Sequence, residues 1–120
     1  MNVKIILGEE FERQVRRLSK KYKSLKDDLK TFRQDLMDNP FQGVELGNGV
    51  RKIRLAISSK GGGKSGGARI LTLTVLVSED ANVTLLTIYD KSEINNVSDK
   101  YIESLVKDAK NNVFSIHAVF

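Results

Sequence analysis

Apolar side chains near the N-terminus follow spacings that predict one short strand and two helices. The strand is the apolar run from Val3 to Leu7. The first helix carries apolar residues at three- and four-residue intervals among charged ones, at Phe11, Val15, Leu18 and Tyr22. The second helix repeats this spacing at Leu25, Leu29, Phe32 and Leu36. The short break at Lys23-Ser24 predicts that these helices form an antiparallel hairpin.

Capping residues mark both ends of the second helix. Ser24 occupies the expected N-cap, and Asp27 follows at the spacing of a capping box. Asn39-Pro40 ends the helix, because proline disfavours a helical conformation in the residue before it. A loop is predicted for the next ten residues, which include Gly43, Gly47, Asn48 and Gly49 and end at Val50.

The rest of the chain predicts strands followed by a last helix. The strands are expected at Val50 to Ile57, Ala68 to Val77 and Val83 to Tyr89. A turn at residues 78–82 joins the last two as a hairpin. Ser98-Asp99 caps a final helix, whose apolar face contains Ile102, Leu105, Val106 and Ala109. The apolar ending, VFSIHAVF, is expected to form an edge strand or to lie over the core.

These elements predict an α+β fold in the order β-α-α-β-β-β-α, with an antiparallel sheet packed against the helical hairpin and the C-terminal helix. The 120 residues, 1–120, suffice for a single domain. The absence of cysteine excludes disulfides and thiolate metal sites and fits a reducing cytoplasm. No apolar run has membrane length and no export leader is present, so we expect a cytoplasmic protein with no membrane partner.

The distribution of charge refines this picture. The net charge of +5 favours an anionic partner, most often nucleic acid. The stretch from Leu46 to Ser78 contains no acidic residue. Its basic residues are Arg51, Lys52, Arg54, Lys60, Lys64 and Arg69. A solvated surface usually mixes both signs, so this stretch predicts an anion-facing surface.

Strand alternation indicates which side chains share a face. In the first of the three predicted strands, Lys52, Arg54 and Ala56 lie opposite Ile53, Leu55 and Ile57. In the last strand, Tyr89 and Lys91 are expected opposite Leu86 and Ile88. If the two polar faces coincide, a phenol and several cations converge on one patch; otherwise the face is merely solvated.

The segment KGGGKSGGAR, from Lys60 to Arg69, contains the end of a phosphate-binding P-loop motif. The full motif needs a glycine where Ser58 stands, and a helix after the loop. A predicted strand follows instead, so we reject a nucleotide site. The glycines are expected to let a hairpin loop run close to a ligand, with Lys64 and Arg69 reaching phosphates; the alternative is a disordered hairpin tip without a ligand.

Three segments of the chain resemble RelE-type toxins of the RelE/ParE superfamily of bacterial toxin–antitoxin pairs. They are LGNGVRKIR at 46–54, GKSGGAR at 63–69 and IYDKSE at 88–93. The lysine-rich helix pair and Asn39-Pro40 support the resemblance. It implies an mRNA interferase, which is an endoribonuclease that enters the ribosomal A site and cuts mRNA there. It also implies inhibition by a cognate antitoxin from an adjacent gene.

RNA cleavage through the 2′-hydroxyl requires proton removal, stabilisation of a phosphorane and protonation of the leaving 5′-oxygen. The single histidine, His117, lies in the apolar ending, where a packed or surface residue is favoured over a catalytic one. No carboxylates show metal-ligand spacing, so we expect neither a metal nor a cofactor. Lysine, arginine, tyrosine and glutamate remain as candidates.

The resemblance assigns residues to this chemistry. The candidate catalytic residues are Lys52, Arg54, Arg69, Tyr89, Lys91 and Glu93. Glu93 is the best carboxylate for a general base, although it also suits a charge at a helix entry. An arginine that some family members carry near this end is absent, which leaves the base and the acid unassigned. Contacts to RNA and rRNA phosphates are expected from Arg51, Lys60, Lys64, Lys20, Lys21 and Lys23.

Two alternatives stay open at the level of sequence. The superfamily includes ParE-like toxins that poison gyrase and lack the RNA-cutting residues, against which the presence of Lys52, Arg54, Arg69 and Tyr89 argues. A degenerate, non-catalytic module that binds RNA or the antitoxin is the second alternative, because fold alone does not settle activity.

Overall fold

The computed structural model describes residues 1–111. The predicted apolar ending and His117 lie outside the described residues. The helices are α1 (Glu9–Lys21), α2 (Leu25–Asp38) and α3 (Asp99–Asn111). The strands are β1 (Val3–Leu7), β2 (Val44–Gly47), β3 (Val50–Leu55), β4 (Ala68–Val77) and β5 (Asp80–Asp90). The expected α+β fold is confirmed, with one strand added to the expected order.

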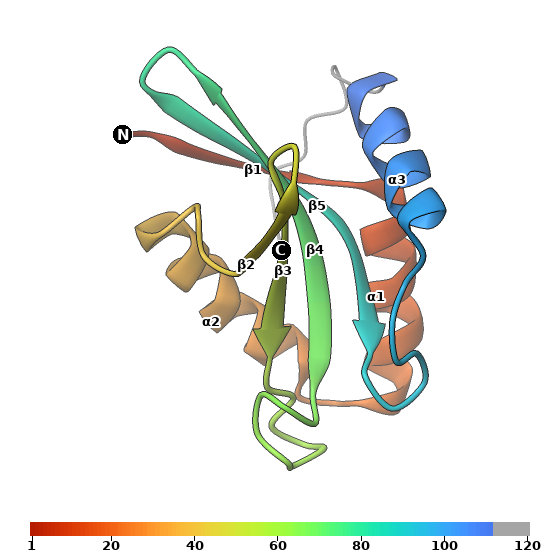
Figure 1. The fold of residues 1–120 in the computed structure, drawn as a ribbon. Coiled ribbons are helices and arrows are strands. Elements are labelled where there is room, and N and C mark those ends of the chain that lie inside the picture. The colour runs from red at the N-terminus through yellow and green to blue at the C-terminus, as the bar shows by residue number, and fades with distance from the viewer. Residues whose placement is uncertain (112–120) are drawn as a thin grey trace.

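The sheet has five strands in the order β1-β5-β4-β3-β2. Strands β2 to β5 pair antiparallel, as predicted, whereas β1 pairs parallel with β5. A parallel pair needs a long crossover between its strands, and here the crossover contains α1, α2 and three strands. Figure 1 shows the β4–β5 hairpin projecting at one end of the sheet and the β3–β4 loop at the other.

Two apolar layers cover the two faces of the sheet. Helices α1 and α2 lie on one face, where Phe11, Leu18 and the predicted stripe of α2 contact Ile53, Ile70, Leu85 and Ile88. Helix α3 lies on the other face, where Leu105 packs with Val50, Leu71, Leu73 and Leu86. The predicted apolar faces of all three helices are therefore confirmed. The basic residues were predicted for an open side of the sheet, but α3 packs against part of the face that carries them.

The predicted loop at residues 41–50 is wrong in part, because it contains β2. Strand β2 pairs with β3 through a tight turn at Asn48-Gly49, whose φ angles are 53° and 84°. Asn-Gly is the pair that suits such a turn, since both central residues need positive φ. All four residues of β2 are exposed, so no apolar periodicity marks the strand.

The predicted capping box at the start of α2 is also wrong. Ser24 is the N-cap, but its side chain makes no cap hydrogen bond. Its hydroxyl donates instead to Asp28 Oδ2 at 2.7 Å, and Asp27 pairs with Lys30 at 3.7 Å. Ser98 behaves as predicted, because its Oγ accepts the Tyr101 backbone N–H at 3.1 Å.

Candidate functional site

Four predicted site residues lie together on the α3 side of the sheet. Arg54 on β3 pairs directly with Arg69 on β4, and Arg69 pairs with Tyr89 on β5. Lys52 lies two residues before Arg54 and so shares its face. Directly paired residues point to the same side of a sheet, so the predicted convergence of cations and a phenol is present. We call Lys52, Arg54, Arg69 and Tyr89 the basic row.

A bulge in β5 corrects one predicted orientation. Thr72 pairs with Leu85 whereas Leu71 pairs with Thr87, so Leu86 is an extra residue in β5. Because of this extra residue, Leu86 and Tyr89 pack in the same cluster under α3. The expectation that Leu86 lies opposite Tyr89 was therefore wrong, whereas Ile88 does face the other side.

Arg69 is a buried cation held by carbonyl groups. Its side chain is only 6% exposed. One terminal nitrogen donates to the carbonyl oxygens of Lys64 at 3.0 Å and Ala68 at 3.1 Å, and the other donates to that of Ser65 at 3.1 Å. Lys64 and Ser65 belong to the glycine-rich loop, so this loop fixes the guanidinium.

Within residues 1–111, no ion pair joins a cation of the basic row to a carboxylate. Like charges placed directly opposite on a sheet are destabilising, and Arg54 and Arg69 form such a pair. A site that keeps this repulsion is suited to an anionic ligand, which relieves it.

Tyr89 is buried beside Arg69. Burial raises the pKa of its phenol above the ordinary value, and the nearby Arg69 charge offsets only part of this effect. The phenol is consequently protonated at neutral pH and is suited to donating a hydrogen bond or a proton.

Lys91 and Glu93 lie beyond the end of β5 and are engaged elsewhere. Lys91 Nζ donates to the backbone and side-chain oxygens of Asn95, both at 2.9 Å. The Glu93 carboxylate accepts two hydrogen bonds from Arg17 of α1, at 2.8 and 3.1 Å. These hydrogen bonds lower the pKa of Glu93, which makes its carboxylate a weaker base.

Asp90 was not singled out from the sequence, but its carboxylate accepts hydrogen bonds from several other segments of the structure. This carboxylate is fully buried and accepts hydrogen bonds from Lys60, Tyr22 and Ser92. An available signal was alternation, because Asp90 shares the core face of Ile88. A carboxylate on an apolar face requires a charged or hydrogen-bonding partner.

The residues predicted to contact phosphates fall into two groups. Lys64, Lys20 and Lys23 are exposed and available to a ligand. Lys60 and Lys21 contact Asp90, at 2.7 and 3.3 Å.

Arg51 alternates with Lys52 and therefore lies on the opposite side of the sheet from the basic row. It pairs with Glu45 at 3.1 Å and lies 5.3 Å from the centre of the Phe41 ring.

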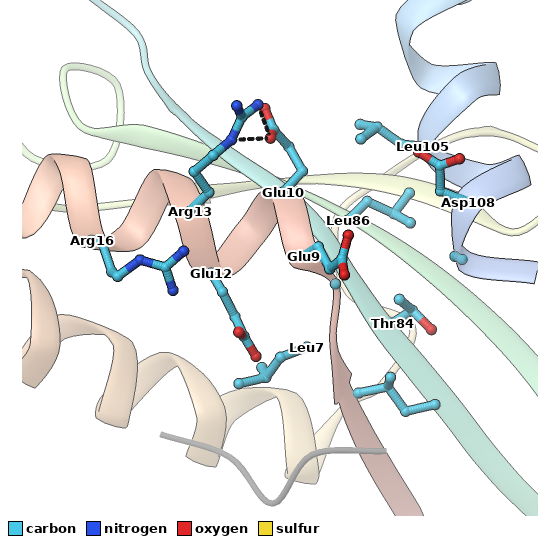
Figure 2. Close-up of a pocket in the computed structure, with 13 residues that line it drawn as sticks. Leu7, Glu9, Glu10, Glu12, Arg13, Arg16, Thr84, Leu86, Leu105 and Asp108 are labelled. Carbon is cyan, nitrogen blue, oxygen red and sulfur yellow. Dashed lines mark hydrogen bonds and ion pairs between the residues drawn. The ribbon is translucent and has the colours of Figure 1, made fainter. Parts of the chain in front are cut away.

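A hollow of about 660 Å³ lies away from the basic row, between the start of α1, β1 and α3. Figure 2 shows its charged rim, where Glu10 pairs with Arg13, and apolar side chains such as Leu86 and Leu105. No residue of the basic row lines it. The candidate site is therefore the basic row on the sheet and not this hollow.

Two further features concern residues 1–111. No cluster of three or more His, Cys, Asp or Glu side chains is arranged to hold a metal ion in this part of the chain. Over the same residues, no helix has the length and apolar character needed to span a bilayer.

Comparison with protein families identifies one that covers nearly the whole chain. Residues 3–118 match the model described as "RelE toxin of RelE / RelB toxin-antitoxin system". This range includes the basic row, the glycine-rich loop and all three helices. The chain belongs to the RelE toxin family, and it is therefore the toxin of a toxin–antitoxin pair, with an antitoxin as partner.

Proposed function

We propose that this toxin is an mRNA interferase, which cuts mRNA in the A site of the ribosome and so stops translation in the cytoplasm. The observation that carries the proposal is the basic row, in which two arginines and a protonated tyrosine lie side by side without a carboxylate partner in residues 1–111. Such a row suits a scissile phosphate, whose negative charge increases in the transition state.

The reaction that we propose is attack of the RNA 2′-oxygen on the adjacent phosphorus. The new bond joins phosphorus to the 2′-oxygen, the bond to the 5′-oxygen breaks, and the products are a 2′,3′-cyclic phosphate and a 5′-hydroxyl. Arg54 and Arg69 stabilise the phosphorane charge, and the carbonyl contacts of Arg69 hold its guanidinium in place before substrate arrives.

Proton transfer falls to the other two members of the basic row. Tyr89 protonates the leaving 5′-oxygen, because its raised pKa keeps the phenol protonated. The 2′-proton passes to Lys52 in its neutral amine form, which becomes the ammonium; neither arginine can take this role, since an arginine keeps its charge in a protein. Glu93 was the best carboxylate by sequence, but its ion pair with Arg17 directs it toward α1. Neither transfer requires a metal or another cofactor.

Single-turnover cleavage of ribosome-bound mRNA tests the proposal. Arg54→Ala or Arg69→Ala should slow cleavage on the order of a hundredfold, the loss seen when one preorganised charge-stabilising donor is removed. Ribosome affinity should change much less. Replacing Lys20 and Lys23 with glutamine should do the reverse, because these exposed lysines supply phosphate contacts and not chemistry.

Several outcomes would contradict the proposal. Equal losses of ribosome affinity and cleavage rate in both variant sets would mean that the arginines and the lysines do not have separate roles in cleavage and binding. Fast cleavage of naked mRNA would mean that the reaction does not depend on the ribosome. Relaxed DNA accumulating in a gyrase supercoiling assay would favour the ParE-like alternative. Normal growth of bacteria that express the protein without its antitoxin would favour a degenerate module.

A further inference from the structure

The carboxylate of Asp90 joins three segments at one end of the molecule. Figure 1 shows that the α1–α2 turn, the β3–β4 loop and the end of β5 meet at this end. Asp90, the last residue of β5, accepts a hydrogen bond from Lys60 of the loop at 2.7 Å. It also accepts one from Tyr22 of the α1–α2 turn at 2.5 Å, and Lys21 Nζ lies 3.3 Å away.

The two lysines that contact Asp90 also lie close to the aromatic ring of Tyr22. Lys21 Nζ and Lys60 Nζ lie 5.2 and 5.7 Å from the centre of the Tyr22 ring. Both distances are within the range of a cation–π contact. The Ser92 backbone N–H and hydroxyl complete the set of donors, at 2.9 and 2.7 Å from Asp90 Oδ1. Lys60 is thus committed to an internal carboxylate and not to solvent.

A second carboxylate holds the same part of the loop. Asp28 of α2 accepts hydrogen bonds from the Ser58 backbone N–H at 3.0 Å and the Ser58 hydroxyl at 2.6 Å. Next to it, the Ser59 backbone N–H donates to the Ser24 hydroxyl at 2.8 Å. The first half of the loop is therefore fixed to the helices before the glycines begin.

The other half of the loop is where Arg69 finds its partners. Lys64 and Ser65, whose carbonyls orient the Arg69 guanidinium, follow the glycines at 61–63. These glycines have backbone φ angles of 80°, 78° and 62°, which residues other than glycine rarely adopt. Three consecutive glycines supply little stiffness of their own, so the path of the loop depends on its anchors.

We propose that Asp90 is a positioning residue. By holding Lys60 it fixes the base of the glycine-rich loop, and the loop in turn presents the Lys64 and Ser65 carbonyls that orient Arg69. Asp90 acts on the cleavage site without touching RNA, and Lys60 serves as the anchor of the loop and not as an RNA contact. The inference rests on the proposed function for its effect on cleavage, but not for its effect on the loop.

The test compares Asp90→Asn and Lys60→Met in the full-length toxin, with Asp27→Asn as a matched control. Asp27→Asn makes the same carboxylate-to-amide change, but its partner is the exposed Lys30. In Lys60→Met, Asp90 keeps its Tyr22 and Ser92 donors, so this variant remains informative if Asp90→Asn fails to fold. The readouts are the backbone amide NMR signals of Gly61, Gly62 and Gly63, single-turnover cleavage on the ribosome, and ribosome affinity.

Asp90→Asn and Lys60→Met should each broaden or shift the three glycine signals. Each should also slow cleavage about 10- to 100-fold, because small displacements of a catalytic group cost that much. Ribosome affinity should be preserved. The double variant should be no slower than the worse single variant, since both changes break the same link. Asp27→Asn should change neither the signals nor the rate.

Two results would overturn the inference. Unchanged glycine signals in both variants would show that Asp90 does not control the loop. Weaker ribosome binding in Lys60→Met, with normal signals and rate in the bound state, would make Lys60 an RNA contact instead. If the wild type does not cut ribosome-bound mRNA, the proposed function fails, and the glycine signals alone then decide whether Asp90 positions the loop.

Discussion

At the scale of single residues, Asp90 links stability to pH. Burial raises the pKa of this carboxyl, but hydrogen bonds from Lys60, Tyr22 and Ser92 outweigh burial and hold the pKa well below its usual range. A carboxyl with a lowered pKa in the folded state adds to the free energy of unfolding above its unfolded pKa, which is about 3.9 for aspartate. That contribution declines as pH falls toward the folded pKa.

Asp90→Asn should therefore lower the free energy of unfolding by roughly 3 kcal/mol at pH 7, because it leaves Lys60 without its carboxylate partner. The gap to the wild type should narrow once the pH falls below about 4. Urea denaturation of both proteins between pH 7 and pH 2 measures the gap directly. A gap that stays constant over this range would mean that the charge of Asp90 contributes nothing.

At the scale of elements, the junction between the glycine-rich loop and β4 depends on Gly67. A Cβ at this position would overlap the carbonyl oxygen of Leu55, at the end of β3. The backbone cannot move away easily, since the Gly67 carbonyl accepts the Lys91 N–H at 3.1 Å. Gly67→Ala should therefore cost about 3 kcal/mol of stability, as overpacking against a fixed neighbour does.

Gly61→Ala is the comparison for this prediction. Nothing lies within 4 Å of a Cβ at Gly61, but its φ is +80°. The expected cost is roughly 1–2 kcal/mol, from the left-handed conformation alone. Thermal or chemical denaturation of both variants gives the two costs. Equal costs would indicate that the close approach at Gly67 is absent in solution.

The elements also show what a sequence can predict. The three helices were predictable because each buries a stripe at helical spacing, as Leu25, Leu29, Phe32 and Leu36 do in α2. Strand β2 was not, because all of its residues are exposed, although Asn48-Gly49 marked the turn beside it. The pairing of β1 with β5 depends on residues about 80 positions apart, which local patterns do not record.

The candidate site was predictable to a similar extent. Alternation placed Lys52 and Arg54 on the open face, and the register then aligned Arg54, Arg69 and Tyr89. Alternation failed at Leu86 because it assumes an unbroken strand, and a bulge adds a residue without a sequence mark. The engagement of Glu93 with Arg17 was beyond prediction, since it joins segments that are distant in sequence.

At the scale of the whole molecule, the basic side chains on the two faces of the sheet differ in whether a carboxylate within residues 1–111 neutralises them. Lys52 and Arg54 belong to the face with the basic row, whereas Arg51 lies on the opposite side and pairs with Glu45. An antitoxin that inhibits the site by covering it should present acidic side chains to the first face. Lys52→Gln/Arg54→Gln should then weaken the toxin–antitoxin complex at moderate salt, and Arg51→Gln should weaken it less.

Co-purification with the antitoxin over a series of salt concentrations measures this difference. Screening by salt should reduce the effect of the double variant, because exposed charge pairs weaken as ionic strength rises. Full retention of the complex by the double variant would move the antitoxin contact to another surface. A larger loss with Arg51→Gln would favour the α2 side of the sheet.

The position of β5 also has a consequence for the synthesis of this toxin. β5 is an interior strand of the sheet, between β1 and β4, and it carries Tyr89 near its end. Synthesis proceeds from the N-terminus, so β1 emerges long before the strand against which it pairs. A chain whose translation stops before β5 lacks the strand that pairs with both β1 and β4, and it lacks Tyr89 of the basic row. If the basic row cleaves mRNA as proposed, aborted products that end before β5 should be inactive.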